Sequence, residues 1–199
     1  MHPLIFATHN ENKVQEIRSL LGTAFDLISL REAGILEEIP ESHDTLEANA
    51  LEKSRTIYAQ TGKDCFSEDT GLEVRALGGE PGVYSARYAG PGKDPAANIR
   101  LLLEKLQGKT VREARFRTVI SLILGEKEYL FEGTCPGRIL QEVRGQKGFG
   151  YDPVFVPDGA DRCFAEMSLE EKNRYSHRAK AFHKLLDFLK QTADGPNSL

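Results

Sequence analysis

The apolar residues of this chain follow two different spacings in turn, and this alternation is the feature that most constrains its fold. Short apolar runs predict strands, whereas apolar residues three and four positions apart predict helices. In the first third of the chain, strands are expected at residues 4–7 and 25–30 and in a run that ends at Glu68 and Asp69, and helices at 14–21 and 44–59. Strands that alternate with helices are typical of an α/β protein.

The rest of the chain is richer in consecutive strands. We expect strands at 114–124, 127–135, 137–143 and 153–156, a helix from Asp94 or Pro95 to Leu106, and helical structure from Ser168 to Lys190 that breaks near Ser176. Glycine-rich stretches at 78–92 and 144–151 predict loops. Because the chain has no internal repeat or linker, we predict one bilobed domain over residues 1–191 and a flexible tail at 192–199.

Local signals mark several helix ends. Two pairs have the spacing of a capping box at a helix start, Asp44 with Glu47 and Ser168 with Glu171. Gly22 and Gly62 follow the first two predicted helices and are expected to end them.

The composition fits a globular protein rather than one that binds nucleic acid or spans a membrane. Of the 199 residues, 40% are hydrophobic and 28% charged, and the net charge is −4, whereas a surface that binds DNA or RNA is usually basic. No apolar run approaches the ~20 residues that span a bilayer. Cys65, Cys135 and Cys163 lie far apart, which argues against a disulfide framework and favours a reducing, cytoplasmic location.

Glu68 and Asp69 are adjacent where a strand is expected to end. Neighbouring carboxylates repel each other, so the pair costs stability unless a cation compensates. Hard oxygen ligands of this kind suit Mg²⁺, which proteins often hold through one or two carboxylates together with substrate phosphates. The alternative is a solvated acidic turn, because the Asp-Thr-Gly that begins at Asp69 is ordinary turn chemistry.

The polar segment 8–13 lies between the first predicted strand and helix. Free N–H groups at a helix N-terminus attract phosphate, Thr8 and Asn10 add side-chain donors, and Lys13 adds a positive charge. The segment lacks the glycine spacing of a Walker A loop. The alternative is that Thr8 or Asn10 only caps the helix while Lys13 is a solvated surface residue.

A glycine-rich segment from Gly145 to Pro153 carries groups suited to a nucleotide base. Its three glycines let a flat ligand approach the backbone, and a ring such as Phe149 could stack on a base. Asp152 precedes a proline and is therefore held extended. The alternative is a hairpin loop whose aromatic side chains cover the edge of the core.

The predicted late helices contain a further polar group. Lys172 and Ser176 share a helical face if the helix is continuous, and His177 and Arg178 supply donors for a carbonyl oxygen or a phosphate. The alternative is a charged, solvated helix face. The histidines show no metal-ligand spacing and no Gly-x-Ser-x-Gly motif occurs, so neither a zinc site nor a serine hydrolase is expected.

Six blocks, taken in this order, resemble the inosine/xanthosine triphosphate pyrophosphatase family, also called the Ham1-like or non-canonical purine NTP pyrophosphatases. The blocks are Thr8-His9-Asn10-Glu11-Asn12-Lys13, Thr45-Leu46-Glu47-Ala48-Asn49-Ala50, Ser67-Glu68-Asp69-Thr70-Gly71-Leu72, residues 77–88, Gly148-Phe149-Gly150-Tyr151-Asp152-Pro153 and Ser176-His177-Arg178. The resemblance spans nearly the whole chain. It implies a long mixed central β-sheet flanked by helices, in two lobes around a deep cleft, and a homodimer.

The resemblance also implies an activity, the Mg²⁺-dependent cleavage of ITP, dITP and XTP to the monophosphate and pyrophosphate, which cleanses the nucleotide pool. It implies that Asp69 is both a metal contact and the proton acceptor. The neighbouring Glu68, and Glu41, are further candidate metal ligands. The substrate-binding residues that it implies are Thr8, His9, Asn10, Glu11, Asn12, Lys13, Thr70, Phe149, Gly150, Tyr151, Asp152, Lys172, His177 and Arg178.

Two positions depart from the family pattern. His9 stands where the first block often has glycine, and its side chain either shifts the loop or adds a contact to phosphate. In the second block Ala48 stands where the family often has glutamate, and Glu47 lies one residue earlier. A shift of one residue turns a side chain by about 100° around a helix. This argues against a metal role for the helix and leaves Glu41 or Glu68 to supply it.

Two other kinds of function compete with this one. A different Mg²⁺-dependent nucleotide hydrolase would remove only the terminal phosphate and release orthophosphate. A non-catalytic nucleotide-binding module would need the phosphate and base sites but not Asp69, and the intact pair Glu68-Asp69 argues against it. The net charge of −4 disfavours a third class, the nucleic-acid-binding proteins.

Overall fold

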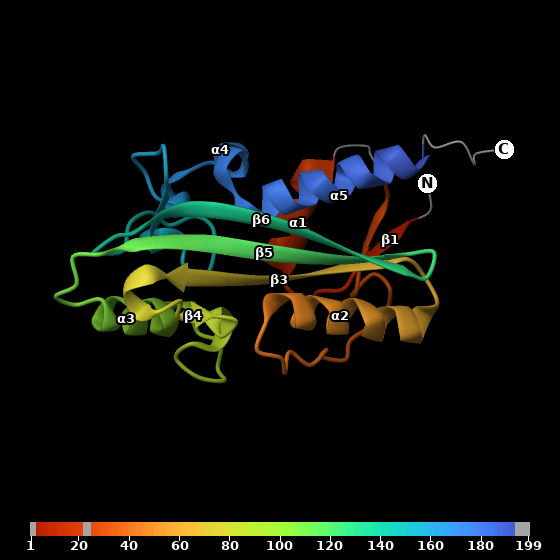
Figure 1. Ribbon diagram of the computed structural model, residues 1–199, viewed down its shortest axis with the longest axis horizontal. Helices are drawn as coiled ribbons and strands as arrows, with labels where there is room; N and C mark the ends of the chain where they lie inside the picture. Colours follow the sequence, from red (N-terminus) through yellow and green to blue (C-terminus); the bar gives the residue numbers. More distant parts are fainter. Residues whose placement is uncertain (1–2, 22–24, 194–199) are drawn as a thin grey trace. The chain divides into compact units, whose positions relative to one another are not determined.

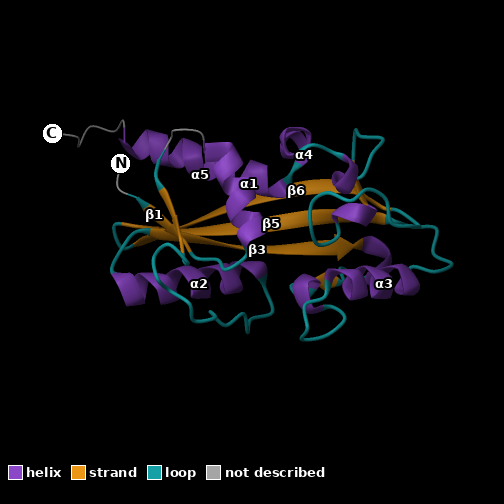
Figure 2. Cartoon of the chain, turned by 180° about the vertical axis from the view of Figure 1, so that it is seen from behind, coloured by secondary structure: helices purple, strands orange, loops and turns teal. Residues whose placement is uncertain are grey.

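The computed structural model describes residues 3–21 and 25–193, which form five α-helices and seven strands (Figures 1 and 2). The helices are α1 (Glu11–Leu21), α2 (Leu46–Thr61), α3 (Pro95–Lys105), α4 (Leu169–Tyr175) and α5 (His177–Ala193). The strands are β1 (Leu4–Phe6), β2 (Leu27–Ser29), β3 (Cys65–Val74), β4 (Pro81–Gly82), β5 (Glu113–Leu124), β6 (Lys127–Ile139) and β7 (Phe155–Pro157). Within these described residues, no helix combines the length and the apolar character that crossing a membrane requires.

The strands form one mixed sheet in the order β2-β1-β3-β5-β6-β7, with β4 beside β3. Strand β1 runs parallel to β2 and to β3, whereas β4 is antiparallel to β3 and β7 is antiparallel to β6. Parallel pairing accompanies the strand–helix alternation near the N-terminus, because parallel strands need a crossover between them. The predicted α/β class and mixed sheet are therefore confirmed.

The chain divides into two compact units, and each is described by itself. Unit 1 comprises residues 1–69, 119–133 and 178–199, and unit 2 comprises residues 70–118 and 134–177. The long strands β3, β5 and β6 each contribute residues to both units. The cleft between lobes that the resemblance implies stays a prediction.

Unit 1 has helices on both faces of its strands. Figure 1 shows α1 and α5 on one face and α2 on the other. Alternation along the strands produces these two layers, since neighbouring strand residues point to opposite faces. Phe6 and Phe66 belong to the core under α1 and α5, with ring centroids 4.5 Å apart, while Ile5 and Cys65 pack with Ile57 of α2.

Unit 2 has its own core. Leu72 of β3 and Leu102 of α3 belong to one buried cluster that also contains the aromatic side chains Phe116, Phe155 and Phe164. Phe116 meets Phe155 edge to face, with the ring centroids 4.6 Å apart. Figure 2 shows α3 and α4 on opposite sides of the strands in this unit.

Helix ends follow local signals with one correction. Thr45, not Asp44, caps α2: its backbone is extended and its hydroxyl accepts a hydrogen bond from the N–H of Ala48. The predicted capping position at Asp44 is therefore wrong by one residue. Gly62 ends α2 in the left-handed conformation, as predicted, with φ of 62°. The predicted stop at Gly22 lies outside the described residues.

The C-terminal helices also follow the prediction closely. Ser168 caps α4 by accepting a hydrogen bond from the N–H of Glu171. The helical structure is interrupted at Ser176, between α4 and α5. Helix α5 continues through Ala193, so the first two residues of the expected tail are helical. Residues 194–199 of that tail lie outside the described residues.

Several predicted strand bounds are wrong. Where a strand was predicted at 153–156 after an extended Asp152, residues 152–154 form a 3₁₀ turn and β7 covers Phe155–Pro157. Strand β3 does not end at Glu68 and Asp69 but continues to Val74. Strand β6 runs to Ile139 through the Pro136-Gly137 pair, where we expected a break between two strands. Gly137 is needed in that strand because β7 approaches closely: a Cβ atom there would lie 2.3 Å from the carbonyl oxygen of Val156.

Candidate active site

The turn between β1 and α1 is fixed by its own side chains. The N–H of Asn10 donates to the hydroxyl of Thr8 at 3.2 Å. The Asn10 side-chain oxygen in turn accepts from the N–H groups of Asn12 and Lys13, at 3.0 and 3.3 Å. Asn10 is therefore the N-cap of α1, and this confirms the capping interpretation for that residue. The cap gives the segment a defined shape from which Lys13 projects.

Glu68 lies within β3, just past the point where the pairing of β3 with β1 ends at Phe66. Its carboxylate is buried, with only 1% of the residue exposed. Lys13 contacts one carboxylate oxygen at 2.9 Å. Arg178 binds both oxygens, with Nε and Nη2 at 2.7 and 2.8 Å, in the two-pronged geometry that favours an arginine–carboxylate pair.

Arg178 is shared between two carboxylates. Its third nitrogen, Nη1, donates to Glu16 of α1, which is itself buried. Burial alone would raise the pKa of Glu68, but the charges of Arg178 and Lys13 outweigh it and hold the pKa of Glu68 well below its usual range. Glu68 is therefore an ionised carboxylate, tied to two cations.

Asp69 has a different set of neighbours. Asn49 of α2 donates to one carboxylate oxygen at 3.1 Å, and the ammonium group of Lys53 lies 3.4 Å from the other. Lys53 also donates to the carbonyl oxygen of Glu68 at 2.7 Å and to the carboxylate of Glu41 at 2.5 Å. Asn49 and Lys53 are four residues apart, so both lie on the same face of α2.

The pKa of Asp69 is raised, in contrast to that of Glu68. Burial is the main cause, and the carboxylate of Glu41 adds to it, while Lys53 and Lys13 act in the opposite direction. The pKa of Lys53 is raised as well: burial would lower it, but Asp69 and Glu41 outweigh that effect. Asp69 is therefore a buried carboxylate with an increased affinity for a proton.

The glycine-rich loop of unit 2 is organised by one carboxylate. Asp152 is buried, and one of its oxygens accepts from the N–H of Phe149 at 2.9 Å and from the ammonium group of Lys172 at 2.5 Å. Gly148 has to be glycine here, because a Cβ atom would lie 2.1 Å from that same oxygen and φ is 74°. Lys172 lies 5.1 Å from the centre of the Phe149 ring. The loop thus holds a cation beside an aromatic ring.

Other predicted substrate-binding residues of unit 2 contact the protein itself. The hydroxyl of Tyr151 donates to the carbonyl oxygen of Ser85 at 2.9 Å, and the hydroxyl of Thr70 lies 2.6 Å from that of Thr118. The ring of His177 stacks on Phe116, with centroids 4.6 Å apart.

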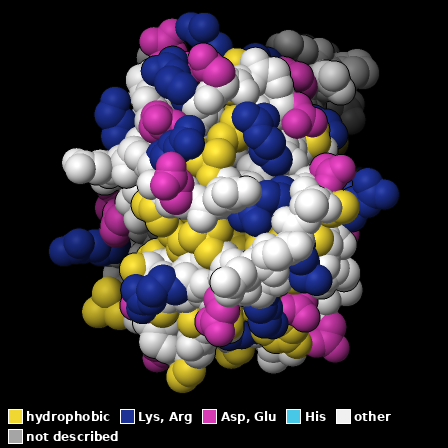
Figure 3. Space-filling view, turned by 90° about the vertical axis from the view of Figure 1, so that its left-hand side faces the viewer, with side chains coloured by type: hydrophobic (Ala, Val, Ile, Leu, Met, Phe, Trp, Pro, Cys, Tyr) yellow, Lys and Arg dark blue, Asp and Glu magenta, His cyan; other side chains and the backbone are white. Residues whose placement is uncertain are grey.

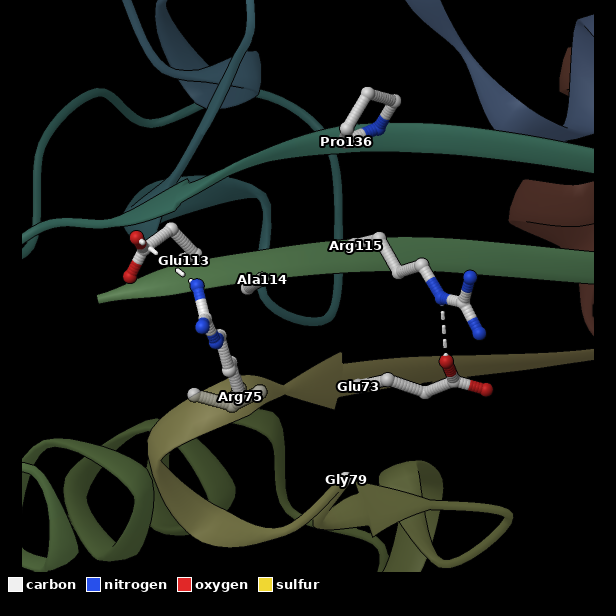
Figure 4. Close-up of a pocket in the computed structure, with 8 residues that line it drawn as sticks. Glu73, Arg75, Gly79, Glu113, Ala114, Arg115 and Pro136 are labelled. Atoms are coloured by element: carbon white, nitrogen blue, oxygen red, sulfur yellow. Dashed lines mark hydrogen bonds and ion pairs between the residues drawn. The ribbon is translucent and has the colours of Figure 1, made fainter. Parts of the chain in front are cut away.

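A surface pocket of about 310 Å³ lies elsewhere in unit 2 (Figure 4). Its lining consists of Glu73, Val74, Arg75, Gly79, Glu113, Ala114, Arg115 and Pro136. Ion pairs across it join Arg115 to Glu73 at 2.6 Å and Arg75 to Glu113 at 3.7 Å. No predicted site residue lines this pocket, so it does not belong to the candidate active site.

The model of one protein family, the Ham1 family, matches residues 4–188 of the chain. This chain belongs to the Ham1 family. The six sequence blocks all lie inside the matched region, and the resemblance drawn from them is confirmed.

Relatives of this Ham1-family protein match it over nearly their full length. A dITP/XTP pyrophosphatase of Christiangramia forsetii is 51% identical over 94% of this chain and 98% of its own. A dITP/XTP pyrophosphatase of Bacillus subtilis is 45% identical over 95% of this chain and 98% of its own. The solved structure of the Staphylococcus aureus Ham1 protein superposes with a TM-score of 0.87 at 37% identity, covering 96% of this chain and all of that one.

The structure of this Ham1-family protein brings the predicted residues into two groups. Unit 1 holds the turn 8–13 together with Glu41, Glu68, Asp69 and Arg178, and unit 2 holds Thr70, the loop 149–152, Lys172 and His177. The two neighbours His177 and Arg178 thus fall in different units. All three guanidinium nitrogens of Arg178 donate to Glu68 or Glu16. The role of Arg178 in base binding stays a prediction.

Three residues of the site were not predicted as site residues: Glu16, Asn49 and Lys53. Asn49 lies in a matched block, and its spacing from Lys53, one helical turn, was the available signal. Glu16 gave no such signal, because its partner Arg178 is 162 residues away in the sequence. Glu47 is half-buried. Helix α2 places the amide of Asn49 and the ammonium group of Lys53 beside Asp69, whereas the family pattern suggested a carboxylate on this helix.

Charges of both signs are interspersed on the face of the protein in Figure 3. Lys and Arg side chains there lie among Asp and Glu side chains, with apolar side chains between them. This face therefore lacks the single-sign basic character that nucleic-acid binding favours.

Proposed function

We propose that this Ham1-family protein hydrolyses non-canonical purine nucleoside triphosphates (dITP, ITP and XTP) to the nucleoside monophosphate and pyrophosphate. Curated relatives named dITP/XTP pyrophosphatase that match nearly the whole chain support this activity. Within the structure, the observation that carries the proposal is the buried Asp69 carboxylate, which has a raised pKa and lies beside Lys53 and Asn49. Removing such nucleotides cleanses the nucleotide pool.

Asp69 acts as the proton acceptor in this proposal. The oxygen of a water molecule forms a bond to the α-phosphorus, and the bond from that phosphorus to the oxygen bridging to the β-phosphorus breaks. The proton of the water passes to Asp69, and pyrophosphate leaves. The raised pKa of Asp69 makes its carboxylate a better proton acceptor than a solvated one.

The turn 8–13 is proposed to bind the triphosphate. Lys13 is the most exposed cation that contacts Glu68 or Asp69, with 15% of its side chain accessible. Its ammonium group can therefore turn from Glu68 to a phosphate, where it stabilises the charge of the leaving pyrophosphate. Thr8 and Asn10 fix the turn, and His9, Glu11 and Asn12 complete the proposed binding segment.

Mg²⁺ is the proposed cofactor, with Asp69 and Glu68 as ligands and Glu41 as a third candidate. Their carboxylate oxygens fit an ion that takes one or two carboxylates together with substrate phosphates. Within the described residues, no group of three or more His, Cys, Asp or Glu side chains is preformed to hold a metal ion. Bound at these carboxylates, Mg²⁺ would neutralise negative charge on the triphosphate.

The loop 149–152 with Lys172, His177 and Arg178 is proposed to bind the base, and Thr70 to contact the substrate. Hypoxanthine and xanthine carry a 6-oxo acceptor where adenine carries a 6-amino donor. Donors held in fixed positions accept the oxo group and reject the amino group, which leaves them unpaired. Lys172 is such a donor, because Asp152 holds it beside the ring of Phe149.

Two further predictions remain proposals: a homodimer, as the family resemblance implies, and a cytoplasmic location, as the widely spaced cysteines suggest. Light scattering from the purified protein would measure its mass directly.

The activity is tested by product analysis on a panel of nucleotides with and without Mg²⁺. We expect pyrophosphate and monophosphate from dITP, ITP and XTP, little turnover of ATP, and none without Mg²⁺. Orthophosphate as the product would identify a different phosphohydrolase. Binding without turnover would identify a non-catalytic module.

A further inference from the structure

His9 projects from a turn whose shape is already fixed. The cap formed by Asn10 and the hydrogen bond from Asn10 to Thr8 hold the backbone on both sides of it. The Nε2 atom of His9 lies 2.8 Å from the carbonyl oxygen of Glu37, 28 residues further along the chain. Because a carbonyl oxygen only accepts, Nε2 is the donor. The side chain at the family's glycine position thus reaches protein backbone.

Glu37 lies in the segment 36–41, which has no helix or strand of its own. Leu36, at its start, is 79% exposed. Beyond its end, His43 and Asn49 exchange two hydrogen bonds between the His43 backbone and the Asn49 side chain. The bond from His9 lies between these two points, at the exposed residue Glu37, while Ile39 packs against the core.

The same segment supplies Glu41 to the candidate active site. Glu41 binds the ammonium group of Lys53, and that ammonium group also lies 3.4 Å from the carboxylate of Asp69. Any displacement of Glu41 therefore changes the charges around Asp69 through Lys53. All of these residues belong to unit 1.

We propose that His9 is a positioning residue: by donating to the carbonyl oxygen of Glu37, it holds the segment 36–41 so that the Glu41 carboxylate reaches Lys53 beside Asp69. Within the proposed triphosphate-binding segment, His9 thus acts through Glu41 rather than through a phosphate contact of its own side chain. The consequence for catalysis rests on the proposed function, whereas the restraint on the segment does not.

The restraint is tested by ¹⁵N NMR relaxation of the protein without substrate. In His9→Ala, the backbone order parameters of Glu37, Glu38 and Ile39 should fall towards those of a flexible segment, below about 0.6, because the bond to the Glu37 carbonyl oxygen is lost. His9→Gln retains a side-chain N–H donor and should recover part of the order. The matched control is His43→Ala, since the His43 side chain contacts Glu52 and its bonds to Asn49 use the backbone. Unchanged order parameters in His9→Ala would overturn the proposal.

The coupling to Glu41 is tested by a double-mutant cycle with His9→Ala and Glu41→Gln. We expect His9→Ala to lower kcat/KM for dITP about fivefold in the wild-type background and to have little further effect once Glu41 is replaced. An equal loss in both backgrounds, carried by KM, would instead assign His9 to direct phosphate binding and overturn the proposal. If the wild-type protein turned over no nucleotide, the proposed function would fail, and the relaxation experiment would still decide whether His9 restrains the segment.

Discussion

Glu68 and Asp69 are neighbours on one strand, yet their surroundings shift their pKa values in opposite directions. Around Glu68, the charges of Lys13 and Arg178 balance those of Glu68 and Glu16. Around Asp69, Lys53 lies between Asp69 and Glu41. Burial raises the pKa of both carboxylates, but the charges of Arg178 and Lys13 outweigh it at Glu68, whereas Lys53 and Lys13, opposed by Glu41, do not outweigh it at Asp69.

This difference separates a cation-binding role for Glu68 from a proton-accepting role for Asp69. A carboxylate with a lowered pKa is a poor proton acceptor but a firm partner for cations, which suits Glu68 for holding Lys13 and Arg178. A carboxylate with a raised pKa accepts a proton readily. Asp69 and Glu41 share the cation Lys53, and a divalent cation would neutralise the negative charge that remains.

The largest expected effect is on catalysis by Asp69→Asn. The amide keeps the shape of the side chain but cannot accept the proton, so kcat should fall by about 100-fold or more. Steady-state pyrophosphate release from dITP measures it. Asp64→Asn is the matched control, because Asp64 accepts from the N–H of Gly125 near the start of the same strand, outside the site. Turnover near the wild-type rate in Asp69→Asn would remove Asp69 from the mechanism.

The two neighbours should respond in opposite ways when each is made neutral. Glu68→Gln removes the carboxylate that binds Lys13 and two nitrogens of Arg178, and should lower the free energy of unfolding by about 3 kcal/mol at pH 7. Asp69→Asn should raise it, since a buried carboxylate with a raised pKa is more costly to ionise in the folded state. Urea unfolding of the two variants and the wild type measures both changes.

The pH dependence of these differences has a definite sign. The stability from Glu68 is present above the pKa of the unfolded chain, about 4.3, and is lost as the pH falls towards its lowered folded value, so the wild-type advantage over Glu68→Gln should shrink in acid. The folded pKa of Asp69 is raised, so Asp69→Asn should gain over the wild type as the pH rises through it. The contrast between Glu68 and Asp69 would be contradicted if the free energies of unfolding of both variants, each relative to the wild type, changed with pH in the same direction.

Arg178→Lys tests how far the Glu68 cluster depends on the guanidinium group. Lysine keeps the charge but cannot bind both carboxylates in the same geometry, so the free energy of unfolding should fall by at least about 2 kcal/mol. Arg174→Lys is the control, because its pair with Glu170 is exposed and such pairs contribute at most about 1 kcal/mol. Equal losses of unfolding free energy in the two variants would show that the burial of the Glu68 cluster adds nothing to stability.

The smallest expected effect is on the acid limb of the kcat/KM profile. Lys53 lowers the pKa of Asp69 and Glu41 raises it. Lys53→Met should therefore move the acid limb to higher pH, and Glu41→Gln should move it to lower pH. If both variants shifted the acid limb in the same direction, that limb would not report the titration of Asp69.

Local sequence signals predicted most helices and strands, whereas the bounds that were predicted wrongly depend on tertiary contacts. Gly62 and Ser168 act at helix ends as predicted because capping depends on residues a few positions apart. The Pro136-Gly137 pair is ordinary turn chemistry, but β7 pairs with β6 across it and keeps it in a strand. Such pairing cannot be deduced from local sequence.

The same distinction applies to the candidate site. The residues with carboxylate and cationic side chains could be proposed from the sequence blocks. The partners that set their pKa values, however, are distant in the sequence. Arg178 is 110 residues from Glu68, so the sequence could not show that it binds this carboxylate. The opposite pKa shifts of Glu68 and Asp69 follow from such contacts, so the sequence could not show them, although the resemblance already assigned the proton acceptor to Asp69.

Carbon-13 NMR titration of the Glu68 and Asp69 side-chain carboxyl groups, in protein free of metal and nucleotide, measures the contrast between them. Substitution of each residue by its amide assigns the two signals. We expect Asp69 to titrate above the usual range for aspartate and Glu68 below that for glutamate, so that Asp69 holds its proton to the higher pH. Titration of Glu68 at the higher pH would contradict the separate roles proposed for the two carboxylates.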